Sequence, residues 1–241
     1  MKIALIGYGK LGKAIEAVAV ERGHEIVLRV TRENAETYDV SDCDVAIECT
    51  NPEAAVHNIT RCLNAKVPVV VGTTGWYHAL DAMKQLAEKQ DTPMLCATNF
   101  SIGVHIFWET NKLLAKLMYK IKGYDVKITE THHVHKKDAP SGTAITTAEV
   151  IMKEQPMKKS WVLKEGDTLP SESELMIEAI RESEAKGTHV VTYTSAVDFI
   201  ELKHEAFNRQ GFASGAVLAA EFLKDRKGVY TMQDVIENII K

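Results

Sequence analysis

The 241-residue sequence has no apolar run long enough to cross a bilayer. Its longest apolar runs, near residues 3–7 and 67–72, fall far short of the roughly 20 residues that a membrane-spanning helix needs. The formal net charge of −4 argues against a surface built mainly for nucleic acid, because such domains are usually basic. The first residues lead directly into a strand pattern without an apolar secretory segment, so we expect a cytoplasmic protein.

Cysteine is also scarce. The four cysteines, Cys43, Cys49, Cys62 and Cys96, lie in apolar surroundings and show no Cys-x-x-Cys spacing. They indicate reduced residues of a protein core rather than a zinc site or a disulfide framework. A hydrophobic fraction of 45% and a charged fraction of 26% are ordinary for a globular protein, and the length allows one large domain or two smaller ones.

The first hundred residues alternate short apolar runs with amphipathic stretches. We therefore expect an α/β fold in which residues 1–100 form a Rossmann-like, doubly wound parallel sheet that binds a dinucleotide. The helices lie between the strands, which are expected near residues 2–7, 25–30, 44–49, 67–71 and 93–97.

The turn after the first expected strand has the pattern Gly-x-Gly-x-x-Gly. The first glycine permits a tight turn, the second lets the backbone approach a pyrophosphate, and the third lets the next helix pack closely on its strand. The N-terminus of that helix supplies amide donors for the phosphates. Because the pattern follows a strand and opens a helix, we assign cofactor binding to Gly7, Tyr8, Gly9, Lys10, Leu11 and Gly12.

Two later strands are expected to end in small and amide-bearing residues. Ligands of parallel sheets bind outside the carboxyl ends of the strands, where such residues can pack against a nicotinamide ring. Ordinary strand-to-helix turns would explain the spacing equally well. The positions added to the cofactor site are Gly72, Thr73, Thr74, Ala97, Thr98, Asn99 and Phe100.

Thr31 and Arg32 bear on the choice of dinucleotide. Folds that prefer NAD usually end the second strand with an acidic residue that holds the ribose hydroxyls. Thr31 stands there instead, and Arg32 after it can bind a 2′-phosphate. We therefore favour NADPH over NADH. The alternative is that Arg32 is a solvated loop cation.

The pattern changes beyond residue 100, where strands no longer alternate with helices. We predict a second, α+β domain over residues 101–208, with an open mixed, largely antiparallel sheet and a charged loop near 158–170. The C-terminal helices within residues 209–241 are expected to pack back on the first domain. The elements expected in the second domain are helices near 102–119 and 143–152, and strands near 124–135, 173–182, 188–195 and 199–206.

Residues 130–144 hold three of the nine histidines, two adjacent lysines and a Pro-Ser-Gly-Thr turn. His133 and His135 with Asp138 approach the spacing of a metal site, but Lys136 and Lys137 would place cations against the metal, so we expect none. A second interpretation takes the histidines as ordinary polar residues of a half-exposed strand.

A third interpretation, an anion-binding acid–base site, is favoured. The turn at 140–143 lies directly before an expected helix, so the amides of Gly142 and Thr143 are expected to be unpaired donors for a carboxylate or phosphate. Lys136 adds a cation, and one histidine supplies the proton donor. Strand alternation places His132 on one face and the other two histidines on the opposite face, so the three cannot share one role.

The sequence resembles the dihydrodipicolinate reductases (4-hydroxy-tetrahydrodipicolinate reductases) of bacterial lysine and diaminopimelate synthesis. The family signature E-x-H-H-x-x-K-x-D-A-P-S-G-T-A is matched at residues 130–144. The glycine-rich turn, the G-T-T-G segment, A-x-N-F-S-x-G at 97–103 and H-x-A-x-x-R-x-x-F-A-x-G-A-V at 204–217 match in the same order. The resemblance covers nearly the whole chain.

This resemblance implies NAD(P)H-dependent reduction of the cyclic dicarboxylate 4-hydroxy-tetrahydrodipicolinate to tetrahydrodipicolinate. It implies His132 as the general acid that protonates the ring carbon next to the hydride-accepting one, and Lys136 as a partner that binds a carboxylate. His133, Gly142 and Thr143 are implied as substrate-binding residues. Family members are typically cytoplasmic homotetramers assembled through the sheet of the second domain.

The chain also departs from the family pattern. An acidic residue is common where Thr31 stands, and the loops around residues 31–44 are short. Fold alone leaves two alternatives, an amino-acid dehydrogenase of the same architecture and a non-catalytic NADP-binding sensor.

Overall fold

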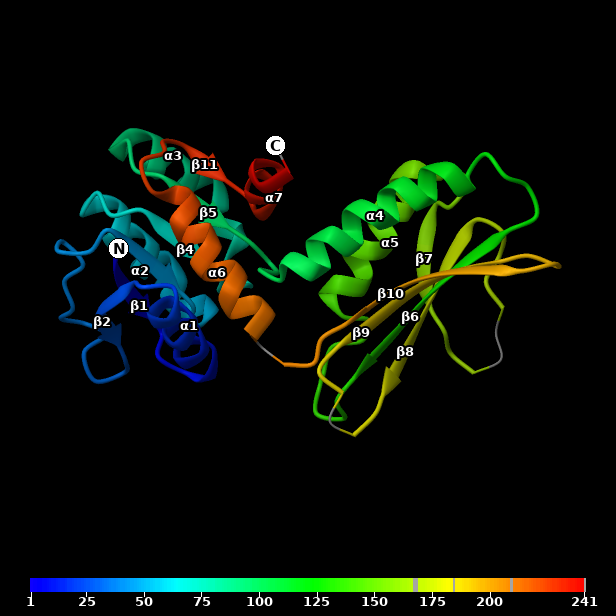
Figure 1. Ribbon diagram of the computed structural model, residues 1–241, viewed down its shortest axis with the longest axis horizontal. Coiled ribbons are helices and arrows are strands. Elements are labelled where there is room, and N and C mark those ends of the chain that lie inside the picture. The colour runs from blue at the N-terminus through cyan, green and yellow to red at the C-terminus, as the bar shows by residue number, and fades with distance from the viewer. Residues whose placement is uncertain (167–168, 184, 209, 241) are drawn as a thin grey trace. The chain divides into compact units, whose positions relative to one another are not determined.

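The computed structural model describes residues 1–166, 169–183, 185–208 and 210–240, with the backbone alone at residue 240. The chain divides into two compact units, whose elements are labelled in Figure 1. The first unit comprises Met1–Ile102 and Arg209–Lys241, and the second comprises Gly103–Asn208. None of the described helices is long and apolar enough to span a membrane.

The first unit is built on a parallel sheet, as predicted. Within the described residues its strands pair in the order β11-β5-β4-β3-β1-β2, and every pairing is parallel. β11 was not expected, because two residues are too few to show a periodic pattern. The strands are β1 (Lys2–Ile6), β2 (Glu25–Val30), β3 (Val45–Glu48), β4 (Val69–Val71), β5 (Met94–Cys96) and β11 (Val229–Tyr230).

The strand order of this sheet reverses beside β1, which pairs with β2 on one side and with β3 on the other. In doubly wound sheets, ligands bind outside the carboxyl ends of the strands at such a switch point. The segments that follow β1, β3, β4 and β5 therefore occupy the edge at which a ligand is expected.

Helices cover both faces of the parallel sheet. One face packs on α1 (Lys10–Glu21), α6 (Gln210–Leu223) and α7 (Met232–Ile240). The other packs on α2 (Pro52–Asn64), the short 3₁₀ helix η1 (Tyr77–Ala79) and α3 (Leu80–Gln90). Neighbouring residues of one strand serve opposite cores, because side chains alternate along a strand. Ile3 and Leu5 belong to the first core, and Ala4 belongs to the second.

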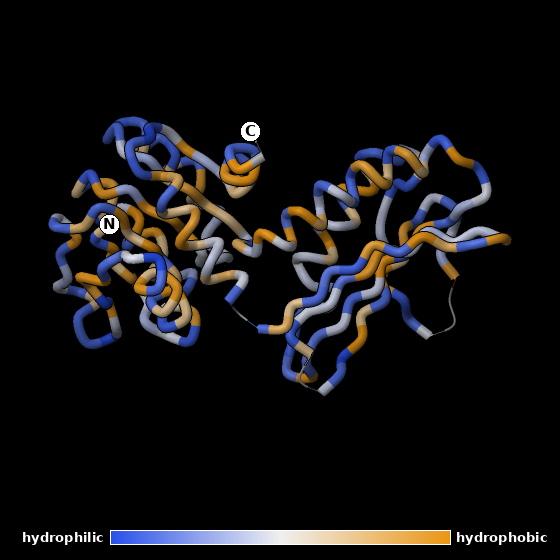
Figure 2. The backbone as a smooth tube through the Cα atoms, viewed as in Figure 1, coloured by the Kyte–Doolittle hydropathy of each residue, from blue (hydrophilic) through white to orange (hydrophobic). Residues whose placement is uncertain are grey.

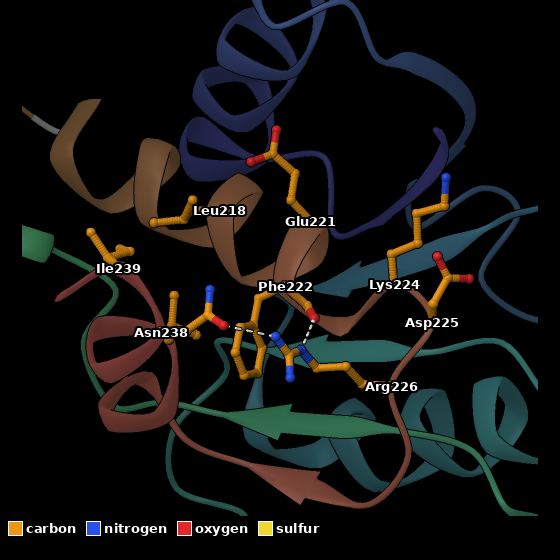
Figure 3. A pocket seen from close by; sticks show the side chains of 9 residues that line it. Leu218, Glu221, Phe222, Lys224, Asp225, Arg226, Asn238 and Ile239 are labelled. Carbon is orange, nitrogen blue, oxygen red and sulfur yellow. Dashed lines mark hydrogen bonds between the residues drawn. The ribbon is translucent and has the colours of Figure 1, made fainter. Parts of the chain in front are cut away.

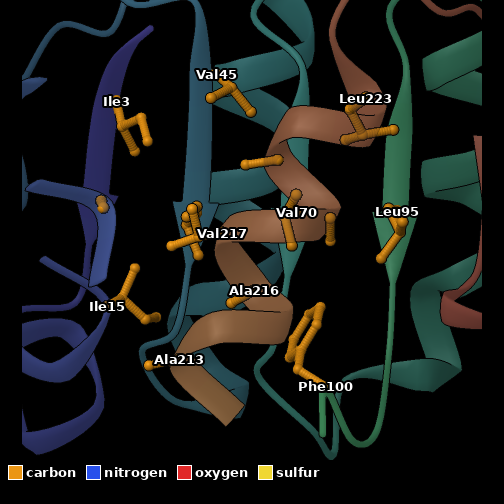
Figure 4. Close-up of a cluster of buried hydrophobic side chains, with 14 of the residues drawn as sticks. Ile3, Ile15, Val45, Val70, Leu95, Phe100, Ala213, Ala216, Val217 and Leu223 are labelled. Carbon is orange, nitrogen blue, oxygen red and sulfur yellow. The ribbon is translucent and has the colours of Figure 1, made fainter. Parts of the chain in front are cut away.

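Helix α6 completes the first core although the whole second unit separates it in sequence from the sheet. Figure 4 shows it lying across the strands, with Val217 and Ala216 directed at them. A Cβ atom at Gly215 would come within 1.7 Å of the carbonyl oxygen of Phe100, so the close approach requires glycine. Figure 2 shows the hydrophobic character of α6 and of the strands beneath it.

The second unit contains a mixed sheet in the order β10-β9-β6-β8-β7 over its described residues. β9 pairs antiparallel with β6 and β10, whereas β8 pairs parallel with β6 and β7. The mixed sheet is confirmed, but it is not largely antiparallel, because part of the expected charged loop forms β7. The strands are β6 (Asp125–His132), β7 (Ser160–Leu163), β8 (Glu174–Arg181), β9 (Thr188–Thr194) and β10 (Phe199–Glu205).

Helices α4 (Ile102–Met118) and α5 (Gly142–Glu154) supply the apolar cover of this sheet. Val126 and Ile128 of β6 join Trp108 of α4 and Ala148 of α5 in one buried cluster. The burial of β6 alternates strictly from Asp125 onwards. The same inward face therefore carries two polar residues at its carboxyl end, Glu130 and His132.

Strand β6 ends at His132, earlier than the predicted end at His135. Its pairing with β9 stops at Thr131 and its pairing with β8 stops at His132. Without partners the chain turns, and the N–H group of Lys136 donates to the carbonyl of His133 at 3.1 Å. The assignment of His133 and His135 to one strand face is therefore wrong.

Candidate active site

The glycine-rich turn lies between β1 and α1 in the first unit. A Cβ atom at Gly7, whose φ is +101°, would lie 2.4 Å from the carbonyl oxygen of Cys49, and one at Gly12 would lie 2.2 Å from that of Gly7. These two glycines are required by close packing of the backbone. A Cβ atom at Gly9 would meet no described atom within 4 Å, so this position leaves open space beside the backbone.

The start of α1 fits a phosphate group. Gly9 is its N-cap, and no side chain among the described residues caps the first turn. The amide groups at the start of a helix need acceptors, and a dinucleotide pyrophosphate supplies them. Lys10 is exposed and Leu11 is half-buried at the beginning of this helix. The predicted segment 7–12 therefore has the geometry of a pyrophosphate site.

The other predicted cofactor segments lie at the same edge of the sheet, because they follow the carboxyl ends of parallel strands. The N–H group of Gly72 donates to the carbonyl of Glu48 at 2.8 Å. The N–H group of Thr50 donates to the hydroxyl of Thr73 at 2.8 Å. The Phe100 ring approaches Gly72, where an added Cβ atom would lie 2.9 Å from it. Thr74 and Thr98 are exposed, Ala97 is half-buried and Asn99 is buried.

Glu48, at the end of β3, was missed by the sequence prediction. Its side chain has no exposed surface. Its Oε1 atom accepts hydrogen bonds from the N–H group of Thr50 at 3.1 Å and from Nδ2 of Asn58 at 3.3 Å. Its Oε2 atom is buried without a partner among the described residues. A carboxylate inside an otherwise apolar strand run was the signal that could have identified it.

Arg32 lies exposed in the turn after β2. Another arginine, Arg29, lies beside the glycine-rich turn, where its guanidinium group is 5.8 Å from the centre of the Tyr8 ring and pairs with Glu16. The Tyr8 hydroxyl also donates to Glu16. Tyr8, Glu16 and Arg29 therefore form one linked group beside the turn, of which the sequence prediction included Tyr8 but not Glu16 or Arg29.

In the second unit, Glu130 is the centre of a buried polar cluster. Both of its carboxylate oxygens accept from the N–H group of Ser141 at 3.1 Å, and Oε1 also accepts from Arg181 at 3.2 Å. Its Oε2 atom lies 3.4 Å from Nδ1 of His132 and 3.7 Å from Nε2 of His189. The cluster thus joins β6, β8, β9 and the start of α5.

The cluster fixes the charge states of two of its members. Burial raises the pKa of Glu130, but the contacts with His132 and Ser141 lower it more, and the result is a pKa of about 2. Burial, together with the nearby His132, lowers the pKa of His189 to about 3. At neutral pH, Glu130 therefore carries a negative charge and His189 is neutral.

The three histidines of the signature lie in different surroundings. His132 is buried in the Glu130 cluster, whereas His133 is half-buried and His135 is exposed in the turn that follows. The turn rather than strand alternation separates them, and the prediction that they differ in role stays a prediction. The ring centres of His133 and His135 are 6.2 Å apart.

Within the described part of the chain, three potential metal ligands come within 4.8 Å of one another, and they are Glu130, His132 and His189. This set differs from the sequence-based candidate, which contained His133, His135 and Asp138. The Arg181 guanidinium already occupies the Glu130 carboxylate. A cation next to a metal ligand disfavours a divalent ion, so the cluster fits acid–base chemistry better than metal binding.

Lys136 follows this cluster in the turn. Its ammonium group lies 2.8 Å from Oδ1 and 2.7 Å from Oδ2 of Asp138, and its side chain is 22% exposed. Arg181 donates to the backbone carbonyl of Asp138 at 2.6 Å, which ties the turn to Glu130. Lys137 is exposed. Lys136 is therefore a restrained cation that already holds one carboxylate.

The start of α5 lies against the same cluster. Ser141 is the N-cap, and its hydroxyl accepts from the N–H group of Ala144 at 3.2 Å. Gly142, the first helical residue, is exposed, and a Cβ atom there would meet no described atom within 4 Å. Thr143 follows it and is half-buried. Gly142 and Thr143 thus occupy the helix start at which an anion would be expected.

A pocket of 440 Å³ also exists in the first unit, beside α6 and α7 (Figure 3). Two of its charged residues, Arg226 and Glu221, make contacts within the unit. Arg226 donates to the carbonyl of Phe222 at 2.8 Å and to Asn238 at 2.9 Å, and Glu221 pairs with Arg22. None of the predicted site residues lines this pocket, so it is not the candidate active site.

Comparison with known proteins identifies the family of this chain. The family described as "Dihydrodipicolinate reductase, N-terminus" matches residues 1–100, and "Dihydrodipicolinate reductase, C-terminus" matches residues 103–236. The chain is 45% identical over 243 residues to a 4-hydroxy-tetrahydrodipicolinate reductase of Christiangramia forsetii, with both chains fully covered. It is 36% identical over 263 residues to one of Archaeoglobus fulgidus, covering 98% of this chain and 100% of the relative.

Solved structures with a similar fold include a member of the same family. A dipicolinate-bound dihydrodipicolinate reductase from Paenisporosarcina matches with a TM-score of 0.77 and 25% identity, covering 97% of this chain and 99% of that one. A probable dehydrogenase from Thermotoga maritima matches with a TM-score of 0.60 at 10% identity, over 100% of this chain and 94% of that one, which shows the fold alone. The family matches together span nearly the whole sequence. The chain therefore belongs to the dihydrodipicolinate reductase family.

Proposed function

We propose that the chain reduces 4-hydroxy-tetrahydrodipicolinate to tetrahydrodipicolinate, a step of lysine and diaminopimelate biosynthesis. The substrate gives up water and gains one hydride and one proton. The observation that carries the proposal is the buried cluster in which Glu130 contacts His132, beside the start of α5. Such a cluster supplies an acid next to a site for anions.

A nicotinamide dinucleotide is the cofactor that membership of the family implies, and when bound it supplies the hydride. The glycine-rich turn fits its pyrophosphate, because Gly9 leaves open space beside the uncapped start of α1. The segments 72–74 and 97–100 are assigned to its nicotinamide end. We also assign Thr50 to the nicotinamide end, because its N–H group donates to the Thr73 hydroxyl and to Glu48.

His132 is assigned the proton transfer. Histidine is the side chain that most often acts as a general acid, and Nδ1 of His132 lies 3.4 Å from the Glu130 carboxylate. His133, in the following turn, is assigned to substrate binding rather than to acid chemistry, because it lies outside the Glu130 cluster. The dipicolinate bound to the Paenisporosarcina enzyme supports a cyclic dicarboxylate as the ligand of this unit.

The substrate carboxylates are assigned to Lys136 and to the helix start at Gly142 and Thr143. Lys136 already holds the Asp138 carboxylate. A substrate carboxylate can take the place of that side chain or share the ammonium group with it, because an ammonium group has three N–H donors. The positive end of the α5 dipole favours a second anion at Gly142.

We further propose NADPH as the preferred dinucleotide, because Thr31 offers no carboxylate to repel a 2′-phosphate and Arg32 is exposed next to it. Assembly into a homotetramer through the sheet of the second unit is also proposed. The support is the edge strand β10, where Phe199 is 65% exposed and Ile200 is 40% exposed. A cytoplasmic location remains our expectation for such a biosynthetic enzyme.

The test is a steady-state assay of the purified chain. NADPH oxidation is followed with freshly made 4-hydroxy-tetrahydrodipicolinate, and NADP⁺ reduction is followed in separate assays with aspartate and with homoserine. The proposal expects turnover with the cyclic dicarboxylate alone. Turnover of an amino acid would instead favour a dehydrogenase of the same architecture, and bound dinucleotide without any turnover would favour a sensor.

A further inference from the structure

We propose that Glu130 is a positioning residue that holds a proton on Nδ1 of His132, so that Nε2 delivers the proton, and that Gly187 lacks a side chain in order to leave Nε2 clear. The inference rests on the proposed reductase function and deepens it. It assigns the reacting atom of the acid and adds two residues, neither of which was a candidate in the sequence.

The contacts of Glu130 determine which atom faces it. Ser141 and Arg181 donate to Glu130, and Arg181 reaches its Oε1 atom. The Oε2 atom, which also accepts from Ser141, faces Nδ1 of His132 at 3.4 Å. This contact lies within ion-pair range but falls short of hydrogen-bond geometry, and Nδ1 is buried with no other acceptor among the described residues. An N–H group at Nδ1 is therefore matched by one acceptor, the Glu130 carboxylate.

The charged groups around the cluster do not compete for that role. His189 of β9 reaches Oε2 at 3.7 Å, but its burial keeps it neutral at neutral pH. Arg181 of β8 divides its guanidinium between Glu130 and the carbonyl of Asp138. Lys136 of the turn holds Asp138 rather than Glu130. The negative charge of Glu130 is therefore available to a proton on His132.

Gly187, before β9, bounds the opposite edge of the His132 ring. A Cβ atom there would lie 3.2 Å from Nε2 and 3.5 Å from Cδ2 of His132. Its φ of +138° is also a conformation that other residues rarely adopt. The ring is thus held by a carboxylate on its Nδ1 side and faces a residue without a side chain on its Nε2 side. Nε2 is therefore the ring nitrogen that does not face Glu130.

The arrangement also explains the chemistry after proton transfer. When Nε2 releases its proton, a neutral imidazole is left behind. Its remaining proton stays on Nδ1, which faces the Glu130 carboxylate. The carboxylate therefore stabilises both the charged form before the transfer and the correct tautomer after it. A neutral residue that offered an N–H group to Nδ1 would favour the opposite tautomer, with a proton fixed on Nε2.

Glu130→Gln tests this argument. The single side-chain oxygen of glutamine must accept from Ser141 and Arg181, so its amide group faces Nδ1. We expect kcat to fall roughly 10²-fold or more, as when the orienting carboxylate of other acid–base pairs is replaced by an amide, while the Kd of dipicolinate changes less than about threefold.

Asp125→Asn is the matched control, since it removes a carboxylate from the same strand. Asp125 pairs with the buried Lys158 at 2.9 Å and lies at the other end of β6. This variant should leave kcat within about twofold of the parent. Gly187→Ala should lower kcat with dipicolinate binding largely kept, because the added methyl group displaces Nε2.

The tautomer itself is measured by ¹⁵N NMR of histidine-labelled protein at high pH. The parent protein should show neutral His132 with its proton on Nδ1, and Glu130→Gln should show it on Nε2. An Nε2–H tautomer in the parent, or unchanged kcat in Glu130→Gln, overturns the inference. The parent spectrum decides the question even where the variant does not fold. Absence of reductase activity in the parent would contradict the proposed function instead, and the tautomer remains measurable in that case.

Discussion

The Nδ1 atom of His132 lies 3.4 Å from a carboxylate oxygen of Glu130, a residue with no exposed surface. A histidine in such a contact has a counterion beside it and little exposure to solvent. The same carboxylate also anchors the start of α5 and Arg181. One residue therefore contacts both the proposed acid, His132, and the helix start that is proposed to bind an anion.

His132→Gln should lower kcat by about 10²–10⁴-fold, the usual effect of removing a general acid. The Kd of dipicolinate should change much less, because the carboxylate-binding groups remain. His135→Gln is the matched control, since His135 is exposed in the turn and outside the Glu130 cluster. Steady-state kinetics and isothermal titration measure both quantities. Equal kcat in the two variants would remove His132 from the mechanism.

Lys136→Ala should raise KM and lower kcat together, because it removes a charged hydrogen bond to a substrate carboxylate. The loss of affinity for dipicolinate is expected to be about 10- to 100-fold. Asp138→Asn provides the complementary measurement. It removes the carboxylate that Lys136 holds in the structure and should not weaken dipicolinate binding. Dicarboxylates that bind Lys136→Ala as tightly as the parent would show that the ammonium group has another role.

Gly9→Ala and Gly12→Ala form a matched pair in the glycine-rich turn. A Cβ atom at Gly9 meets no described atom within 4 Å, whereas one at Gly12 would lie 2.2 Å from a backbone oxygen. Gly9→Ala should therefore keep the parent's melting temperature and bind NADPH more weakly. Gly12→Ala should melt at a lower temperature. Unchanged NADPH affinity in Gly9→Ala would separate this turn from the pyrophosphate.

Stability is expected to fall in acid. Below pH 6.5 the unfolded chain binds a proton at His189 that the folded chain does not bind until pH falls to about 3. Below pH 4.5 the same holds for Glu130, whose folded pKa is about 2. In both cases the stabilisation is present at neutral pH and is lost as pH decreases. For Glu130 the shift corresponds to about 3 kcal/mol.

Urea denaturation at pH 7, 5.5 and 4 checks this dependence. His189→Gln cannot take up a proton, so its free energy of unfolding should depend less on pH between 6.5 and 4 than that of the parent. An identical pH dependence in the two proteins would show that another group is responsible for the acid instability.

Arg32→Ala should weaken NADPH binding about 10- to 100-fold and leave NADH binding unchanged, if Arg32 contacts the 2′-phosphate. Arg29→Ala is the control, because Arg29 is linked to Glu16 and Tyr8 beside the turn that both dinucleotides share. That variant should affect the two cofactors equally. Fluorescence titration with each dinucleotide measures the difference. Equal effects of Arg32→Ala on both would leave Arg32 a surface charge.

Much of this arrangement was visible in the sequence. The glycine-rich turn and its flanking elements are local, and the bounds of β2 were predicted without error because its pattern is bounded by a glycine and a turn. Alternation along the strand also placed Glu130 and His132 on one face, and the structure shows that this face is buried. The roles assigned to these residues rest on the signature and stay predictions until the variants are measured.

Other features depend on contacts that no local pattern records. Arg181 contacts Glu130 across 51 residues of sequence, and the neighbourhood of His189 and Gly187 exists only once β9 pairs with β6. The early end of β6 had the same origin, because it is set by where β8 and β9 stop pairing. The half-buried residues of β7 show no alternation, so that strand was taken for a loop.

The most direct test of the central claim follows the hydride. NADPH doubly deuterated at C4 of the nicotinamide ring is supplied with 4-hydroxy-tetrahydrodipicolinate, and the tetrahydrodipicolinate formed is analysed by mass spectrometry. The account predicts a product one mass unit heavier than that formed with ordinary NADPH, at a rate that falls in His132→Gln. A product without deuterium, or no product at all from a folded chain that binds NADPH, would contradict it.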